Sequence, residues 1–422
     1  MKYNIPLVAK KKTDVLIVGS GVVGWSIAHQ LLKKGIRSTL VDKGDLGAGC
    51  SYGNAGWLTP CFAMPLPQPG MLIKSMKWLL DPESPLHIQP RLSMNLAKWM
   101  WIFLRSMNQD QTRKAVQFLT GISTFSLKEY EELGKKYPDL VQFEKKGLLM
   151  ATATRDGEKA AVDEMNFVAE FGIPGKFLKA DEVRSLEPAL VGNLRSGVYF
   201  PEEAHAEPMG IVKALAKECL QQGCEFLPNH EVFDFEVQGD QIRAVLTTQG
   251  KIQADRVIMA AGSWSPALAK LLDMPIPILG GKGYSMIVKD FNPKPKIPLM
   301  LIEKKIAVTP RQDSIRLAGT LELVDQDFGI SPRRLRSIWR GAREFLNVPE
   351  QLEVQEIWRG LRPCTPTGIP WIGPSEKWSN LTLCVGHQML GLQSAPGSGR
   401  LVAEMINGEK TFLPLYQPFR SE

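Results

Sequence analysis

A glycine-rich turn near the start of the chain constrains the fold more than any other sequence feature. Gly19, Gly21 and Gly24 form GxGxxG between the β-branched run DVLIV and the helical segment WSIAHQLLKKG. Asp42 ends the next strand-like run, STLVD. The first glycine permits a tight turn, the second lets a pyrophosphate approach the backbone, and the third allows close helix–strand packing. Because helix N–H groups would face the phosphates and Asp42 the ribose hydroxyls, the spacing predicts a site for NAD or FAD.

Length and composition favour a large protein with two structural lobes. The chain has 422 residues, of which 44% are hydrophobic. A single domain core does not normally bury that many hydrophobic residues, so we expect two lobes.

Six cysteines form no Cys-x-x-Cys pair and only five histidines are present, so we expect reduced thiols and no metal site. A net charge of +7 without an extended basic run makes nucleic acid a poor candidate partner. With neither a signal-peptide pattern nor a membrane-length apolar run, we expect a cytoplasmic protein.

Hydrophobic periodicity divides the remaining chain into helical and strand-rich parts. Residues 71–107, 112–137 and 332–346 have helical spacing. The helical segment GIVKALAKECLQQG leads into the strand-like runs CEFLPNHEVFDFEV, QIRAVLTTQG and DRVIMAAGSWS. The closing part has the pattern strand, strand, helix. These elements predict an α/β fold class, α+β overall.

Three further segments narrow the choice of cofactor. They are CSYGNAG after the N-terminal unit, DRVIMAAGSWS in the middle, and WRGLRPCTPTGIPWIGPS followed by VGHQMLGLQSAPGSGRLVAEMI near the end. In these motifs the chain resembles the D-amino-acid oxidase superfamily of FAD enzymes, and most closely the D-amino acid dehydrogenases and their glycine-oxidase-like relatives. The resemblance covers nearly the whole chain. It implies a Rossmann-like FAD-binding domain with an interleaved substrate domain of antiparallel sheet plus helices.

The resemblance also implies that both domains are discontinuous. We expect the FAD-binding domain to combine residues 13–75, 200–270 and 355–420. The substrate-binding domain would hold residues 76–199 and 271–354.

The cofactor implied by the resemblance is FAD held without a covalent bond. Cys364 lies near the position where some sarcosine oxidases attach flavin, but its spacing to the following Thr-Pro differs. Gly397 to Gly399 are expected to open a helix whose N-terminal N–H groups face the flavin. The expected cofactor-binding residues are Gly19, Gly21, Gly24, Asp42, Lys43, Ser51, Asn54, Ala55, Gly56, Val232, Ala261, Gly262, Trp264, Gly386, Gly391 and Leu392.

Three residues are candidates for the substrate side of the site. The resemblance places a carboxylate-binding arginine at Arg362 in GLRP, and a guanidinium fork suits a carboxylate. Arg359, one helical turn away, would compete for this role. Tyr284 in GGKGYSM would bond a carboxylate or amine, with half-buried packing as the alternative. His387 in VGHQML would approach the flavin ring, with a core histidine bonded to backbone as the alternative.

The implied activity is oxidative deamination of D-amino acids. A hydride passes from the α-carbon to flavin, and the imine then hydrolyses to a 2-oxo acid and ammonia. We expect a quinone or another non-oxygen acceptor. The apolar and basic segments MLIKSMKWLL and LAKWMWIFLRSM would allow peripheral contact with the cytoplasmic face of the inner membrane, although helices that pack in the substrate domain have the same composition.

Other functions remain open at this point. The nearest is an oxidase of glycine, sarcosine or cyclic D-amino acids, such as D-proline or D-hydroxyproline, that uses oxygen. A non-catalytic flavin-binding subunit of a larger complex is the alternative of another class. A third, an NAD-dependent dehydrogenase, would give a colourless protein.

Overall fold

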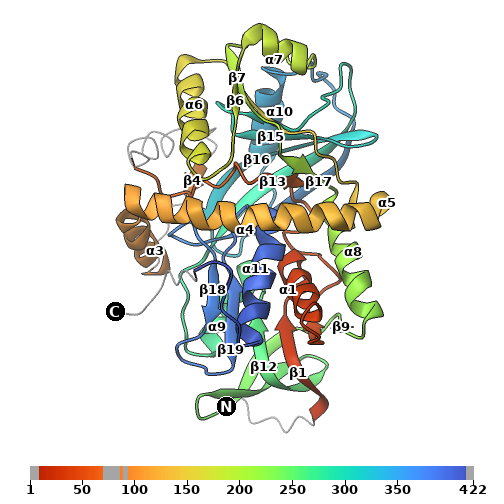
Figure 1. Ribbon diagram of the computed structural model, residues 1–422, viewed down its shortest axis with the longest axis vertical. Helices are drawn as coiled ribbons and strands as arrows, with labels where there is room; N and C mark the ends of the chain where they lie inside the picture. Colours follow the sequence, from red (N-terminus) through yellow and green to blue (C-terminus); the bar gives the residue numbers. More distant parts are fainter. Residues whose placement is uncertain (1–8, 70–85, 89–93, 415–422) are drawn as a thin grey trace.

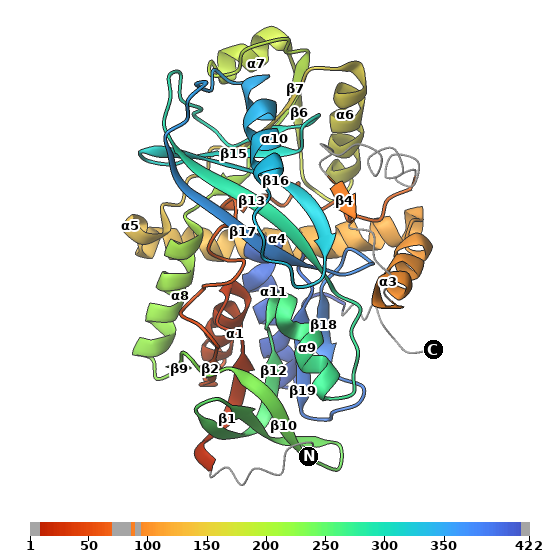
Figure 2. The same ribbon diagram turned by 180° about the vertical axis from the view of Figure 1, so that it is seen from behind.

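Two sheets form the frame of the protein, described over residues 9–69, 86–88 and 94–414 of a computed structural model. One sheet has eight strands and the other has nine. The long helix α4 (Gln109–Lys136) crosses the boundary between them on one side of the molecule (Figures 1 and 2). A two-stranded ribbon pairs β3 (Trp57–Leu58) with β8 (Ala204–His205). The predicted α/β fold class is therefore confirmed.

The first sheet carries the glycine-rich turn. Its parallel strands are, in spatial order, β9 (Glu225–Leu227), β2 (Thr39–Val41), β1 (Ala9–Val18), β12 (Gly250–Met259) and β19 (Leu381–Val385). The antiparallel strands are β11 (Gln241–Thr247), β10 (Val232–Gln238) and β18 (Trp371–Pro374). Figures 1 and 2 show helices on both faces, with α1 (Val22–Leu32), α8 (Pro208–Gln221) and α11 (Gly391–Ile406) on the side of α4, and α9 (Ser265–Leu271) on the other.

Small residues let α11 lie close to its neighbours. A Cβ on Gly399 would lie 2.6 Å from the carbonyl oxygen of Ser26 in α1. A Cβ on Gly397 would lie 2.5 Å from the carbonyl oxygen of Ile122 in α4. Because a backbone atom cannot move aside as a flexible side chain can, glycine at both positions sets how closely the three helices pack.

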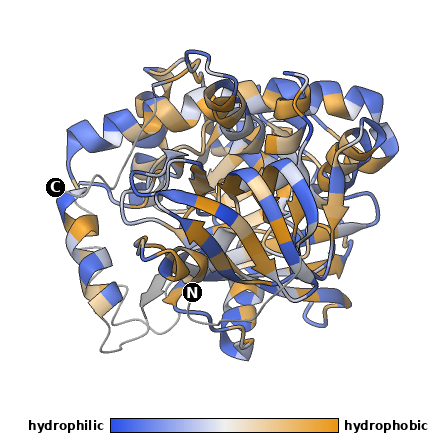
Figure 3. Ribbon diagram, turned by 90° about the horizontal axis from the view of Figure 1, so that it is seen from below, coloured by the Kyte–Doolittle hydropathy of each residue, from blue (hydrophilic) through white to orange (hydrophobic). Residues whose placement is uncertain are grey.

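The second sheet is largely antiparallel. Its strands, in spatial order, are β17 (Val354–Cys364), β13 (Leu279–Lys289), β16 (Ser314–Val324), β15 (Ile306–Pro310), β14 (Leu299–Leu301), β5 (Leu148–Thr152), β7 (Ser196–Phe200) and β6 (Lys176–Lys179), with β4 (Leu86–Ile88) beside β16. The remaining helices are α3 (Met94–Arg105), α5 (Pro138–Val141), α6 (Arg155–Ala169), α7 (Ala180–Leu186) and α10 (Pro332–Arg343). Seen from below, the peripheral helices alternate polar and apolar turns around the strands (Figure 3).

The expected elements are found with two qualifications. The helices predicted at 112–137 and 332–346 are α4 and α10, and α3 covers part of the predicted 71–107. The segment MLIKSMKWLL lies outside the described residues. β17 pairs with β13 along nearly its whole length, so residues 354–364 belong to the second sheet and not with the rest of 355–420. The domain division otherwise stays a proposal.

A buried carboxyl group ties the loop between β7 and β8 to the segment after β3. Glu203 is 2% exposed, and its Oε1 accepts a hydrogen bond from the backbone N–H of Cys61 at 3.0 Å. Its Oε2 is buried and has no hydrogen-bond partner among the described residues. Burial, the largest effect, raises the pKa of Glu203 to about 8.

This shift predicts how stability changes with pH. Between the ordinary glutamate pKa and about 8, Glu203 is protonated in the folded chain but ionised in the unfolded one, so its effect on stability becomes less favourable as pH rises. Glu203→Gln mimics the protonated group. Its free energy of unfolding is expected to rise relative to that of the wild type by about 1.4 kcal/mol for each pH unit over that window. Urea unfolding at pH 5 and pH 8 measures the difference. A gap that is equal at both pH values would contradict the assignment.

Candidate active site

The glycine-rich turn has the geometry that its spacing predicts. Gly19 has φ +115°, and a Cβ there would lie 2.4 Å from the carbonyl oxygen of Ala260 at the end of β12. A Cβ on Gly24 would lie 2.0 Å from the carbonyl oxygen of Gly19. Any side chain at either position would push α1 away from β1 or β1 away from β12. The turn therefore requires glycine for steric reasons alone.

Asp42 lies at the end of β2 and faces this turn. Its Oδ2 accepts hydrogen bonds from the backbone N–H and the hydroxyl of Ser20, at 2.7 and 2.9 Å. Its Oδ1 accepts from the N–H of Gly44 at 3.1 Å. These bonds fix the carboxylate beside the turn, where a ribose is expected.

One cavity of about 1710 Å³ runs from this turn to the boundary between the sheets. The predicted cofactor residues that line it are Gly19, Gly21, Asp42, Lys43, Ser51, Asn54, Ala55, Val232, Ala261, Gly262, Trp264, Gly391 and Leu392. The predicted substrate residues Tyr284, Arg362 and His387 line the same cavity. Three predicted residues do not line it, namely Gly24, Gly56 and Gly386.

The last two of these glycines shape the backbone instead. Gly56 has φ +84° and Gly386 has φ +82°, values that L side chains rarely adopt. A Cβ on Gly56 would also lie 2.4 Å from the carbonyl oxygen of Ala206. Their positions suit a structural role beside the cavity, and their contact with the cofactor stays a prediction.

The segment from Ser51 to Ala55 is held from both sheets. The hydroxyl of Ser51 accepts a hydrogen bond from the N–H of Val22, at the start of α1, at 2.9 Å. On the other side, the hydroxyl of Thr309 donates to the carbonyl oxygen of Ala55 at 2.8 Å. Arg316 donates to the carbonyl oxygen of Asn54. The segment from Ser51 to Ala55 is thus bonded both to α1, beside the first sheet, and to β15 and β16 of the second sheet.

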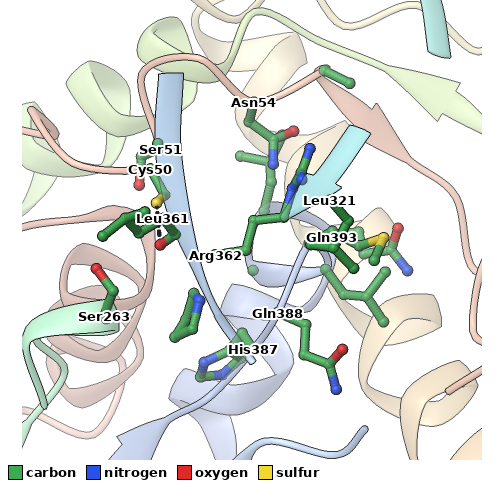
Figure 4. A pocket seen from close by; sticks show the side chains of 18 of the residues that line it. Cys50, Ser51, Asn54, Ser263, Leu321, Leu361, Arg362, His387, Gln388 and Gln393 are labelled. Atoms are coloured by element: carbon green, nitrogen blue, oxygen red, sulfur yellow. Dashed lines mark hydrogen bonds between the residues drawn. The ribbon is translucent and has the colours of Figure 1, made fainter. Parts of the chain in front are cut away.

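Arg362 projects from β17 into the cavity (Figure 4). A Cβ on Gly283 would lie 2.1 Å from its Nη1, so glycine on the paired strand leaves room for the guanidinium. Nη1 donates to the carbonyl oxygen of Thr320 at 2.8 Å. Desolvation lowers the pKa of Arg362, although arginine stays protonated. Among the described residues, no carboxylate lies within ion-pair distance of it.

The partner of Arg362 has an uncommon backbone conformation. Thr320 has φ +62°, which is strained for a β-branched residue, and it lies where the register of β13 and β16 shifts. This bulge aims the Thr320 carbonyl at the guanidinium. Such strain is often found at functional sites, where surrounding contacts maintain it.

Tyr284 lines the cavity, but its hydroxyl is already engaged. The hydroxyl donates to Oε2 of Glu322 at 2.8 Å, and the side chain is 1% exposed. Glu322 also accepts from Nε of Arg334 at 2.9 Å and lies 3.7 Å from Nζ of Lys282. The side chain is therefore fully buried, and not half-buried as the packing alternative expects, and substrate contact by this hydroxyl stays a prediction.

His387 lies close to the start of α11 and faces the cavity (Figure 4). Its Nε2 is 3.1 Å from the hydroxyl of Ser398. Burial lowers the pKa of His387 to about 4, so the imidazole is neutral at pH 7. The alternative expectation, a core histidine bonded to backbone, differs from the structure in that the partner is a side-chain hydroxyl, and an approach to the flavin ring stays a prediction.

Two expectations about local structure are wrong. α11 begins at Gly391, so Gly397 and Gly399 lie inside the helix and serve packing, while its first turn lines the cavity. Arg359 and Arg362 lie on a strand, not one helical turn apart, and side chains three positions apart on a strand point to opposite faces. Nε of Arg359 donates to the carbonyl oxygen of Phe328 at 2.7 Å.

The structure also adds cavity residues that the sequence did not single out. Cys50 lines the cavity, and its thiol donates a hydrogen bond to the carbonyl oxygen of Leu361 (Figure 4). Cys364, by contrast, is fully buried and is not among the residues that line the cavity. Gln388 is 7% exposed, has φ +52° and lines the cavity as well. Composition and spacing carry no signal for such positions, because they depend on how distant segments meet.

Comparisons with known proteins agree with this geometry. The family described as DAO, FAD dependent oxidoreductase, matches residues 14–405. A D-amino acid dehydrogenase of Granulibacter bethesdensis is 30% identical over 402 residues, covering 94% of this chain and 96% of that protein. A D-amino acid dehydrogenase of Vibrio atlanticus is 31% identical over 401 residues with the same coverage.

Solved structures share the fold. A glycine oxidase of Bacillus cereus has a TM-score of 0.74 at 22% identity and covers 94% of this chain and 96% of its own. An L-proline dehydrogenase of P. horikoshii has a TM-score of 0.77 at 20% identity and covers 97% of each chain. With a family match over nearly its whole length, a steric cradle for a dinucleotide and a cavity beside it, the chain belongs to the DAO family of FAD-dependent oxidoreductases.

Proposed function

We propose that this protein is an FAD-dependent dehydrogenase of D-amino acids. Arg362 carries the proposal, because its guanidinium lines the cavity without a carboxylate partner among the described residues. A partly buried cation is stabilised by an anion that binds it in a bidentate manner. A substrate carboxylate is such an anion. The D-amino acid dehydrogenases at 30–31% identity support amino acids as the substrate class.

The residues of this chain would orient the substrate and leave the redox step to the cofactor. A bound FAD would supply the hydride acceptor for the substrate α-carbon. Arg362 would fix the carboxylate, and the Thr320 carbonyl would hold the guanidinium in one orientation. The neutral imidazole of His387 places no further positive charge near a substrate amine. The imine product would hydrolyse in water to a 2-oxo acid and ammonia.

Sequence similarity, and not the fold, supports substrates of the D configuration. Solved structures of this fold include a glycine oxidase and an L-proline dehydrogenase, so the architecture accepts achiral and L substrates. The relatives at 30–31% identity are D-amino acid dehydrogenases, and they match this chain over almost their full length. One arginine fixes only one substituent of a chiral centre, and handedness needs the rest of the cavity.

Anaerobic bleaching of the flavin absorption band tests the proposal. We expect several D-amino acids to bleach the bound flavin at least tenfold faster than their L isomers, because only one hand presents the α-hydrogen when the carboxylate is fixed. Glycine, sarcosine and both hydroxyproline epimers serve as comparison substrates. Faster bleaching by these would favour the oxidase alternative. No bleaching by any compound, with FAD retained, would reject the proposal in favour of a non-catalytic flavin subunit.

The electron acceptor is proposed to be a quinone reached at a membrane surface. α3 exposes Met94, Trp101 and Leu104, of which Met94 is 86% and Trp101 58% exposed. Lys98 and Arg105 share the helix, which has no acidic residue. Apolar and basic side chains together suit the interface of an anionic membrane. None of the described helices combines the length and apolar composition needed to cross a membrane.

Variants on α3 test this part of the proposal. Trp101→Ser combined with Leu104→Ser should lower binding to vesicles of phosphatidylethanolamine and phosphatidylglycerol by at least fivefold, since both remove exposed apolar area. Sedimentation measures the bound fraction, and high salt should lower wild-type binding. Phe177→Ser on β6, 44% exposed, is the matched control. Equal binding of all three proteins, or peroxide formation with oxygen as fast as quinone reduction, would contradict this acceptor.

A further inference from the structure

Four side chains form a stack of rings and cations along one wall of the cavity. Nζ of Lys43 lies 4.3 Å from the ring centroid of Trp264. The rings of Trp264 and Phe328 are stacked at 5.9 Å and 15°. Cζ of Arg359 lies 5.6 Å from the ring centroid of Phe328. All four residues line the cavity.

This stack joins the two sheets. Lys43 follows β2 and Trp264 follows β12, both in the first sheet. Phe328 lies in the loop between β16 and α10, and Arg359 lies on β17, both from the second sheet. Groups from the two halves of the fold thus meet on the part of the cavity that begins at the glycine-rich turn.

The cations at the two ends are available to a ligand. Among the described residues, neither Lys43 nor Arg359 has a carboxylate within ion-pair distance. Nε of Arg359 is bonded to the carbonyl oxygen of Phe328, which holds the side chain in place and leaves its terminal nitrogens without an assigned hydrogen bond. Cations of this kind suit the phosphate and carbonyl oxygens of a dinucleotide cofactor, which accept hydrogen bonds from arginine and lysine donors.

The loop that carries Phe328 is held in place before any ligand binds. Nζ of Lys282, which is 5% exposed, donates to Oδ2 of Asp327 at 2.6 Å and to the carbonyl oxygen of Gly329 at 3.2 Å. Oδ1 of Asp327 accepts from the N–H of Gly329 at 2.8 Å. Lys282 also faces Glu322, the partner of the Tyr284 hydroxyl. The ring of Phe328 is thus positioned from the β13–β16 ladder, which lowers the ordering cost of binding.

We propose that Phe328 and Arg359 complete the FAD-binding site from the second sheet, together with Lys43 and Trp264 of the first. The two cations, at opposite ends of the stack, interact with different polar groups of the extended cofactor, and the ring pair covers the part of the cofactor between them. This inference depends on FAD as the cofactor and not on the identity of the substrate. It assigns a binding role to two residues that lie far from the glycine-rich turn in the sequence.

Titration of the apoprotein with FAD, followed by flavin fluorescence, tests the inference. Arg359→Gln is expected to raise the Kd for FAD about tenfold and Phe328→Leu about fivefold, because each removes one contact to the ligand but keeps most of the side-chain volume. Lys43→Gln tests the opposite end of the stack and should also raise the Kd. Arg343→Gln is the matched control, since Arg343 makes a similar contact with Trp339, 5.1 Å from its ring centroid, on α10 outside the cavity.

Salt and unfolding measurements separate ligand contact from mere packing. The wild-type Kd should rise with ionic strength, and this dependence should be weaker in Arg359→Gln and Lys43→Gln. The unfolding midpoint of each apoprotein should stay near that of Arg343→Gln. An unchanged Kd in Arg359→Gln and Lys43→Gln overturns the inference, as does a raised Kd that only follows a lowered apoprotein midpoint. Absence of amino acid oxidation would reject the proposed function but would leave these binding results intact.

Discussion

The close contact between the glycine-rich turn and the end of β12 is the constraint on which the site depends. Gly19 and Gly24 bring β1, α1 and β12 to distances that no side chain would allow. Since the strands from β9 to β19 run parallel, their carboxyl ends open on the same edge of the sheet. The cavity begins at this edge. Without that close packing, neither Asp42 nor the first turn of α11 would face it.

The second sheet contributes residues to the cavity that begins at the first sheet. β17 and β13 bring Arg362 and Tyr284 to the cavity, and β15 and β16 hold the segment that carries Asn54 and Ala55. The strained conformation of Thr320 orients Arg362 directly. The site is therefore shared between two sheets, and a change in how they meet alters both the cofactor side and the substrate side of the cavity.

Local pattern predicted the glycine-rich turn and Asp42, because their requirements are local, whereas the family resemblance supplied the other predicted cofactor residues that line the cavity. A tight turn, a helix start and an acid at the end of a strand leave direct marks on the sequence, as Gly19 and Asp42 demonstrate. Gly399 was misassigned because a glycine that serves helix packing looks the same in sequence as one that starts a helix. The predicted position of Arg359 relative to Arg362 was wrong, because side chains three positions apart share a face of a helix but lie on opposite faces of a strand. Phe328 was missed because its loop reaches Trp264 only through tertiary structure.

The proposed function depends on Arg362 binding the carboxylate of the substrate. The most direct measurement is the binding of propionate, which lacks an α-amino group, to the FAD-loaded protein through the shift of the flavin absorption band. Arg362→Met should weaken binding on the order of a hundredfold with FAD retained, because it leaves the carboxylate without its charged partner. Arg362→Lys, which keeps the charge but not the fork, should lie in between. Equal affinity in the wild type and Arg362→Met would show that Arg362 does not bind the carboxylate.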